Sequence, residues 1–199
     1  MELVFIHGAN GSAQVWNYLS SQLTDYAKTF IEYNSFNEFD VNLADQVNTL
    51  LNKKNLFFIG HSMGGIYAYY LQSIFFRQSL GGITMSAPYG GSGLSNTMKL
   101  LFPWYDYPLW VDTAIHSPLI ERMKELPTPK NWHQIVSTTD RTFFPLEPND
   151  GLITKSSQMA LKGINYIPLN DSHYECVQSP KVAEIINNIT QKTLKKHDE

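Results

Sequence analysis

The order in which apolar segments follow one another is the feature that most restricts what this chain can fold into. Short apolar runs, which are typical of buried strands, alternate with segments whose apolar residues recur at helical spacing. Strands are expected at residues 3–6, 29–33, 56–59, 82–85, 134–137 and 164–168. Helices are expected at residues 12–23, 41–51, 66–76, 156–161 and 182–194. In the second of these helices, one side is apolar and is expected to face the core: Val41, Ala44, Val47 and Leu51.

This alternation predicts an α/β fold with about six mostly parallel strands and helices on both faces of the sheet. The chain has 199 residues, which is enough to bury a substantial core and is typical of one domain. Hydrophobic residues make up 43% and charged residues 17%. Disordered chains instead have few hydrophobic and many charged residues. We therefore expect a single domain over residues 1–199.

Charge and cysteine content exclude several other classes of protein. The formal net charge is -3 and no run of Lys or Arg exceeds two residues, so no nucleic-acid partner is expected. The one cysteine, Cys176, leaves no internal disulfide and no cysteine cluster for zinc. No apolar run approaches the roughly 20 residues of a membrane span, so no integral membrane segment is expected. The first residues lack the basic region of a signal peptide, and a cytoplasmic location is expected.

A serine flanked by glycines lies where an expected strand meets an expected helix. Gly60, Ser62 and Gly64 match G-x-S-x-G, between the apolar run at 56–59 and the apolar helix at 66–76. In this motif a sharp strand-to-helix turn exposes the serine hydroxyl, and the glycines let the strand and helix pass closely. A glycine-rich turn with an incidental serine is the alternative interpretation. The strand and helix on either side favour a nucleophile.

On these residues the chain resembles the α/β-hydrolase family, and within it the lipase and esterase branch. His7-Gly8 looks like the early His-Gly turn of that family, and residues 86–92 look like a Pro-x-x-Gly-Ser stretch of many lipases. Tyr89 stands where those lipases often have histidine, which leaves its local role open. The resemblance implies a single-domain α/β-hydrolase fold that lacks the two leading strands of the family. It implies neither a cofactor nor a metal.

The resemblance also indicates where an oxyanion could bind. It implies that the second strand lies on one side of the first strand and the third on the other, so that a crevice opens between His7-Gly8 and Ser62. Two backbone N–H groups are candidates for an oxyanion hole, Met63 directly after the nucleophile and, by the family match, Ala9. His7 itself is expected to be a structural hydrogen-bonding residue.

Six histidines compete for the role of general base. His61 adjoins the nucleophile, but the turn is expected to point it away from the site. The family order is Ser, then acid, then His, and His133, His173 and His197 lie downstream of the serine with room for an acid between. His173 lies in a polar loop between the last expected strand and the closing helix. It is therefore the candidate base, and a surface loop histidine is the alternative.

Two aspartates fit the position of the acid that would orient the base. Asp140 follows the fifth expected strand immediately, and its alternative role is a strand-end cap. Asp150 lies in residues 149–154, which resemble the Asn-Asp-Gly-Leu-Val stretch around the catalytic aspartate of several bacterial lipases. Asn-Asp-Gly is also a common turn sequence. Asp150 is favoured because its motif matches residue by residue.

Residues 94–132 separate two strands by more than one helix requires. Pro103 and Pro108 are expected to prevent a long helix there. This cap-like insertion carries large aromatic residues that we expect to border the crevice and bind an apolar group: Trp104, Tyr105, Tyr107 and Trp110. Ordinary packing against the sheet is the alternative for some of them.

Taken with the resemblance, these residues predict a serine hydrolase that cleaves a carboxylic ester. Ser62 would attack the carbonyl, His173 would move the proton, Asp150 would orient His173, and Ala9 and Met63 would hold the oxyanion. The expected partner is a small-molecule ester with an apolar acyl group. A thioesterase or amidase would use the same residues, and a non-catalytic binding protein is an alternative of another class.

Overall fold

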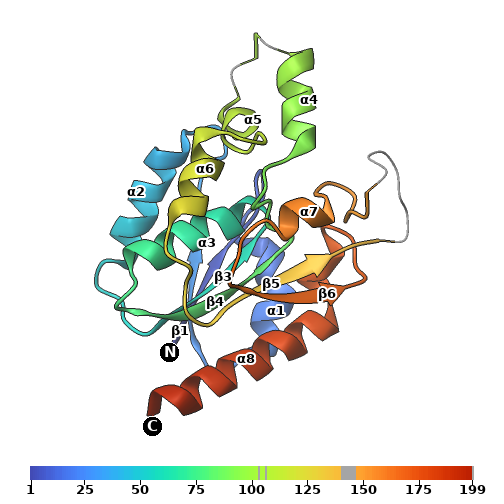
Figure 1. Ribbon diagram of the computed structural model, residues 1–199. Coiled ribbons are helices and arrows are strands. Elements are labelled where there is room, and N and C mark those ends of the chain that lie inside the picture. Colours follow the sequence, from blue (N-terminus) through green and yellow to red (C-terminus); the bar gives the residue numbers. More distant parts are fainter. Residues whose placement is uncertain (103, 106, 140–146, 199) are drawn as a thin grey trace.

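The computed structural model describes residues 1–102, 104–105, 107–139 and 147–198. Its centre is a parallel six-stranded sheet in the order β2-β1-β3-β4-β5-β6 (Figure 1). The strands are β1 Glu2–Ile6, β2 Ala27–Ile31, β3 Leu56–His61, β4 Ser79–Met85, β5 Trp132–Ser137 and β6 Asn165–Leu169. The α/β class, the six strands and the parallel sheet are therefore confirmed.

Helices cover both faces of this sheet, as the alternating pattern predicts (Figure 1). The helices on one face are α2 Phe39–Leu50, α3 Met63–Ile74 and α6 Pro118–Glu125. The helices on the other face are α1 Asn17–Gln22, which continues the short 3-10 helix η1 Ala13–Trp16, and α8 Pro180–Asp198. Because side chains of a strand alternate between faces, Val4 and Ile6 pack into the first core while Leu3 and Phe5 pack into the second.

The prediction for the buried side of α2 was right for Val47, which packs against the core, and wrong for Val41, Ala44 and Leu51, which are exposed. Val41 and Leu51 are 49% and 57% exposed, whereas Asn42 and Gln46 are buried. Asn42 donates from Nδ2 to the Tyr67 hydroxyl oxygen at 3.1 Å and to a backbone carbonyl at 2.9 Å. The side of α2 that faces the core carries an apolar stripe, Phe39, Leu43, Val47 and Leu50, and Asn42 and Gln46 lie along it. The expected helix began at residue 41 and therefore left Phe39 out of this stripe.

The direction in which successive strands are added to the sheet reverses at β1. β1 pairs with β2 on one side and with β3 on the other, and the chain crosses from β2 to β3 by way of α2. In an open parallel sheet this reversal leaves a crevice at the carboxyl ends of the strands. The predicted position of the crevice, above β1 and β3, is thus confirmed by the topology.

The insertion at 94–132 is more regular than its prolines suggest. It forms α4 Gly93–Leu101, α5 Pro108–Asp112 and α6, and prolines occupy the first positions of α5 and α6, where no backbone N–H is needed. Helix α6 packs into the core through Leu119, Ile120 and Met123. Helix α4 instead stands away from the body of the molecule, at the end where the strands finish (Figure 1). Pro103 lies outside the described residues.

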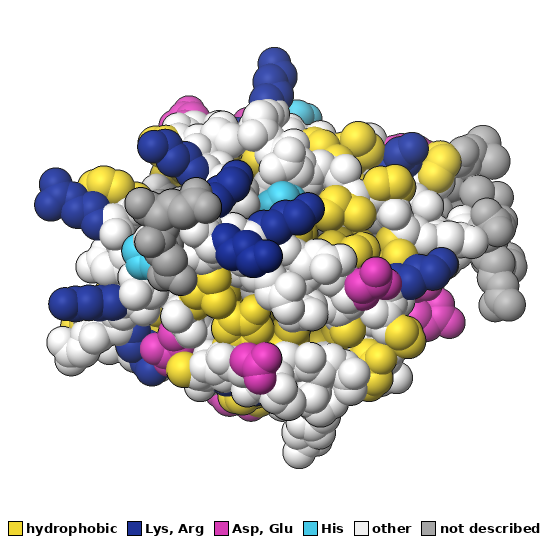
Figure 2. Space-filling view, turned by 90° about the horizontal axis from the view of Figure 1, so that it is seen from below, with side chains coloured by type: hydrophobic (Ala, Val, Ile, Leu, Met, Phe, Trp, Pro, Cys, Tyr) yellow, Lys and Arg dark blue, Asp and Glu magenta, His cyan; other side chains and the backbone are white. Residues whose placement is uncertain are grey.

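The opposite end of the molecule has a mixed surface. Figure 2 shows this end with Lys and Arg side chains standing out between scattered apolar patches. Within the part of the chain that the structure describes, no helix combines the length and the apolar character that crossing a membrane requires.

Candidate active site

Ser62 occupies a strained turn between β3 and α3. Its φ and ψ are 53° and -125°, a backbone conformation that residues other than glycine rarely adopt. The turn is held from β4, because the Ser62 N–H donates to the Met85 carbonyl at 2.9 Å. The glycines on either side are required by close packing: a Cβ at Gly60 would lie 2.6 Å from the Gly64 carbonyl oxygen. The G-x-S-x-G sequence is thus explained by this geometry.

Ser62 lies on the wall of a cavity of about 320 Å³ at the carboxyl ends of the strands. Ala9, Met63 and His173 line the same cavity. The structure therefore brings to one cavity the candidate nucleophile, the candidate base and the two residues whose N–H groups are candidates for an oxyanion hole. These residues come from the ends of β1 and β3, the start of α3 and the loop after β6.

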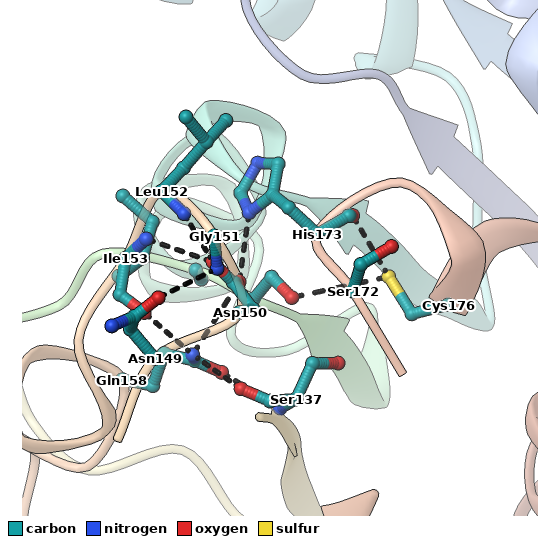
Figure 3. A network of polar contacts seen from close by, with 12 residues as sticks. Ser137, Asn149, Asp150, Gly151, Leu152, Ile153, Gln158, Ser172, His173 and Cys176 are labelled. Atoms are coloured by element: carbon teal, nitrogen blue, oxygen red, sulfur yellow. Dashed lines mark hydrogen bonds and ion pairs between the residues drawn. The ribbon is translucent and has the colours of Figure 1, made fainter. Parts of the chain in front are cut away.

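Asp150 and His173 form a buried pair beside this cavity (Figure 3). His173 Nδ1 lies 2.8 Å from Asp150 Oδ2, and the His173 backbone N–H donates to the Asp150 carbonyl oxygen, also at 2.8 Å. A neutral imidazole that donates from Nδ1 to a carboxylate keeps Nε2 free as a proton acceptor. Asp150 is 1% and His173 4% exposed, so water does not weaken this contact.

The second oxygen of Asp150 is held by its own loop. Oδ1 accepts the backbone N–H groups of Leu152 at 2.9 Å and Ile153 at 2.8 Å (Figure 3). Burial raises the pKa of the Asp150 carboxyl, but the hydrogen bond and charge of His173 and these two amides outweigh burial and lower it. Asp150 is thus kept ionised. The Asn-Asp-Gly sequence is a turn here, and the turn itself orients the carboxylate.

Asp140, the other aspartate considered for the acid, lies outside the described residues. Of the two aspartates, the contact with His173 that the structure describes is that of Asp150. Gln158, at the end of α7 Lys155–Gln158, supports the Asp150 loop by donating from Nε2 to the Ile153 carbonyl at 3.2 Å and by approaching Asp150 Oδ2 at 3.4 Å. The sequence carries no motif for this glutamine.

His61 lies closer to the candidate base than expected. The sequence predicts that it points away from the site, but it lines the cavity, and its ring centroid is 4.8 Å from that of His173. His61 Nε2 lies 2.7 Å from the His173 carbonyl oxygen. Burial, reinforced by the nearby His173, lowers the pKa of His61 to about 3, so it is neutral and donates this hydrogen bond.

The turn after β1 is fixed by several polar contacts. His7 is fully buried, its Nδ1 lies 2.7 Å from the Gly8 carbonyl oxygen, and its ring stacks on Tyr33. The Tyr33 hydroxyl donates to the His7 carbonyl at 3.0 Å. His7 thus has the contacts of a structural hydrogen-bonding residue. These contacts hold the backbone that carries Ala9 on the cavity wall.

The four aromatic residues of the insertion separate into two pairs. Trp110 lines the cavity, and Tyr107 is buried with its hydroxyl 2.7 Å from Asn10 Oδ1. Trp104 and Tyr105 are 78% and 53% exposed. Neither they nor Tyr107 belong to the cavity wall, which differs from the expectation that all four residues border it. Large size and clustering alone could not distinguish the two pairs.

Sequence reasoning also missed several residues of the cavity wall. The missed residues of this wall include Asn10, Val15, Ser95, Leu109, Thr113, Leu152, Ile153 and Tyr174. Most are apolar or carry a hydroxyl group and lie outside any motif. Tyr89, whose role was open, is buried, and its hydroxyl contacts Thr84 at 2.7 Å and accepts from Trp132 Nε1 at 3.1 Å.

The site contains no obvious metal-binding cluster. Among the described residues, no three His, Cys, Asp or Glu side chains are grouped as metal ligands would be.

No family model and no curated protein sequence matches the chain. Solved structures do match. A lipase of Bacillus licheniformis in its mature form is 14% identical with a TM-score of 0.71, over 94% of this chain and 91% of that chain. A metagenomic carboxyl esterase is 14% identical with a TM-score of 0.77, over 96% and 76%. A lipase-esterase related protein from Clostridium acetobutylicum is 16% identical with a TM-score of 0.64, over 94% and 93%. The chain therefore adopts the α/β-hydrolase fold.

Proposed function

We propose that the protein is a serine hydrolase that cleaves carboxylic esters. The observation that carries this proposal is the buried Asp150–His173 pair, whose His173 lies on the cavity wall that also carries Ser62. Burying a carboxylate together with an imidazole costs free energy, so the pair is better explained by a role in catalysis than by a contribution to stability. A nucleophile, a base and an acid around one cavity are what acyl transfer requires.

In the proposed first step, Ser62 Oγ attacks the ester carbonyl carbon and its proton passes to His173 Nε2. Asp150 stabilises the imidazolium that forms, without taking the proton itself. The negative charge on the former carbonyl oxygen is stabilised by the N–H groups of Ala9 and Met63. Each such donor contributes about 3 kcal/mol to the stability of the transition state. Met63 is also the first residue of α3, where the helix dipole favours negative charge.

The tetrahedral intermediate then collapses and releases the alcohol. His173 gives its proton to the leaving oxygen, which leaves an acyl group on Ser62. A water molecule, deprotonated by His173, attacks this acyl-enzyme, and the carboxylic acid departs as Ser62 Oγ regains the proton. The protein ends unchanged, and one ester and one water have become one acid and one alcohol.

The apolar lining of the cavity supports a preference for esters with an apolar acyl group. Val15, Leu109, Trp110, Leu152 and Ile153 supply aliphatic and aromatic surface near Ser62. A cavity of about 320 Å³ lies at the low end of the range for small-molecule sites. We further propose that α4 and α5 act as a small cap over this cavity. Thioesters and amides remain substrates that the same residues could cleave.

Labelling with a fluorophosphonate probe tests this proposal directly. The parent protein should react with one equivalent of probe at Ser62, located by mass spectrometry, and Ser62→Ala should not react. The parent should also hydrolyse 4-nitrophenyl esters, and comparison with matched thioesters and anilides will rank the leaving groups. A folded parent that neither labels nor hydrolyses any of these would instead be a binding protein with a hydrolase fold.

A further inference from the structure

The insertion is tied to the turn after β1 by a partly buried hydrogen bond. The Tyr107 hydroxyl donates to Asn10 Oδ1 at 2.7 Å. Tyr107 is 7% exposed and directly precedes α5, the helix that carries Trp110 on the cavity wall. Its ring also packs against Trp110 and against Phe36, at centroid distances of 5.5 and 5.0 Å. Tyr107 therefore links a substrate-facing helix to the backbone around Ala9.

Asn10 is the residue through which this link would act on Ala9. The Gly11 N–H donates to the Gly8 carbonyl at 3.1 Å, which closes a turn over Ala9 and Asn10. Asn10 has φ 55°, as the third position of a type II turn requires. Its backbone N–H donates to Ser35 Oγ at 2.8 Å. With its side chain held by Tyr107 and its N–H by Ser35, Asn10 fixes the orientation of the peptide groups beside it.

We propose that Tyr107 is a positioning residue that holds the Ala9 N–H in place for the oxyanion by fixing Asn10. This inference rests on the proposed function, since it concerns the same reaction. The Tyr107 hydroxyl does not touch the substrate in this scheme. Its contribution is made through the turn, and it matters most when charge develops on the carbonyl oxygen and the donor must lie at the right distance.

The Tyr107→Phe variant tests the proposal because it removes one oxygen atom and keeps the ring that packs on Trp110. We expect kcat to fall about 10-fold, since a small misplacement of a donor costs less than loss of the donor. KM should stay within about 2-fold, because binding of the uncharged ester does not depend on the oxyanion contact. A mere loss of stability would not separate kcat from KM in this way.

Two inhibitors give a second measurement of the same effect. A boronic acid with the acyl chain of the substrate forms a tetrahedral adduct on Ser62 and places an oxygen where the oxyanion would lie. The alcohol of the same chain length fills the cavity but forms no tetrahedral adduct on Ser62, so it lacks the charged oxygen at the oxyanion position. Tyr107→Phe should weaken the boronic acid by about the same factor as kcat and leave the alcohol unchanged, because the lost interaction belongs to the transition state.

Tyr70→Phe is the matched control. The Tyr70 hydroxyl donates to the Leu119 carbonyl at 2.8 Å, so this variant also removes one tyrosine hydrogen bond to the insertion, but away from the cavity. It should keep the kcat and the boronic acid affinity of the parent. Asn10→Gly removes the acceptor while glycine tolerates the positive φ. Adding Tyr107→Phe to Asn10→Gly should therefore cause no further loss of kcat.

Two outcomes would overturn the inference while leaving the hydrolase intact. One is a Tyr107→Phe variant with the kcat and boronic acid affinity of the parent. The other is a loss that multiplies fully with that of Asn10→Gly, which would mean that the two residues act separately. A parent protein without labelling at Ser62 and without ester turnover would instead overturn the proposed function, so the two failures can be told apart.

Discussion

His61 Nε2 lies 2.7 Å from the backbone carbonyl oxygen of His173, so the residue before the candidate nucleophile holds the loop of the candidate base. The backbone N–H of His173 is held in turn by the Asp150 carbonyl at 2.8 Å. Both backbone polar groups of His173 thus have fixed partners, and its side chain has a third in Asp150 Oδ2. The base is positioned by its main chain as well as by its carboxylate.

This arrangement predicts that His61 makes the fold sensitive to acid. The pKa of His61 is about 3 in the folded protein, where burial opposes its charge, and 6.5 is its ordinary value in an unfolded chain. Below pH 6.5 the imidazole of His61 is protonated in the unfolded state but not in the folded state. The free energy of unfolding therefore falls as the pH falls toward 3. At pH 5 the loss from this one group should be about 2 kcal/mol relative to pH 7.

The measurement is urea unfolding of the parent and of His61→Gln at pH 7 and pH 5. The variant should lose about 2 kcal/mol less between the two values than the parent does, because it lacks the titrating ring. His197→Gln, which changes an exposed histidine near the end of α8, should keep the pH dependence of the parent. An equal loss of unfolding free energy between pH 7 and pH 5 for the parent and His61→Gln would contradict the assignment of acid sensitivity to His61.

Ser62→Ala should abolish turnover and leave the fold intact. Loss of a nucleophile that acts together with its base lowers kcat by about 10⁶. Because the backbone at Ser62 is strained at φ 53°, Ser62→Gly should be more stable than Ser62→Ala, by about 1–3 kcal/mol. Circular dichroism and thermal unfolding check the fold and the stability. Turnover by purified Ser62→Ala within 100-fold of the parent would exclude Ser62 as the nucleophile.

The sheet and the strand-to-helix turn could be predicted because both depend on local sequence. A buried parallel strand such as β3 is apolar over residues 56–59, and its end is marked by Gly60. The orientation of α2 was predicted only in part, because its apolar stripe begins at Phe39, before the expected helix, and its buried Asn42 pairs with Tyr67, which lies 25 residues away. Pairings of this kind leave no periodic pattern.

The site was predictable only in part for the same reason. Ser62 and Asp150 lie in short motifs whose turns need particular residues, and His173 follows the last strand. Gln158 and Tyr107 contact the site from other elements and belong to no motif. Trp104 and Trp110 look alike in sequence, and only their places relative to α5 separate an exposed residue from one on the cavity wall.

Asp150→Asn should lower kcat by about 10⁴ with little change in fold. The amide keeps the size of the carboxylate, but it favours the wrong tautomer of His173 and cannot stabilise the imidazolium. KM should change little, and the loss is measured by steady-state kinetics on a 4-nitrophenyl ester. Asp140→Asn is the comparison that decides between the two aspartates. If Asp140→Asn were the more damaging change, Asp150 would be a turn residue and not the acid.

Trp110 should set the preference for longer acyl chains. Each CH₂ group that is buried against the cavity wall stabilises the bound chain by about 0.8 kcal/mol, so kcat/KM should rise from acetyl to medium-length 4-nitrophenyl esters and then level off where the cavity ends. Trp110→Ala should flatten this rise and leave acetyl ester turnover nearly unchanged, because the lost contacts are to the chain and not to the reacting carbonyl. Trp104→Ala is the matched control, since Trp104 is 78% exposed and outside the cavity wall, and it should keep the parent profile. A profile that is flat in the parent, or flattened equally by both changes, would remove Trp110 from the acyl site while leaving Ser62, His173 and Asp150 in their proposed roles.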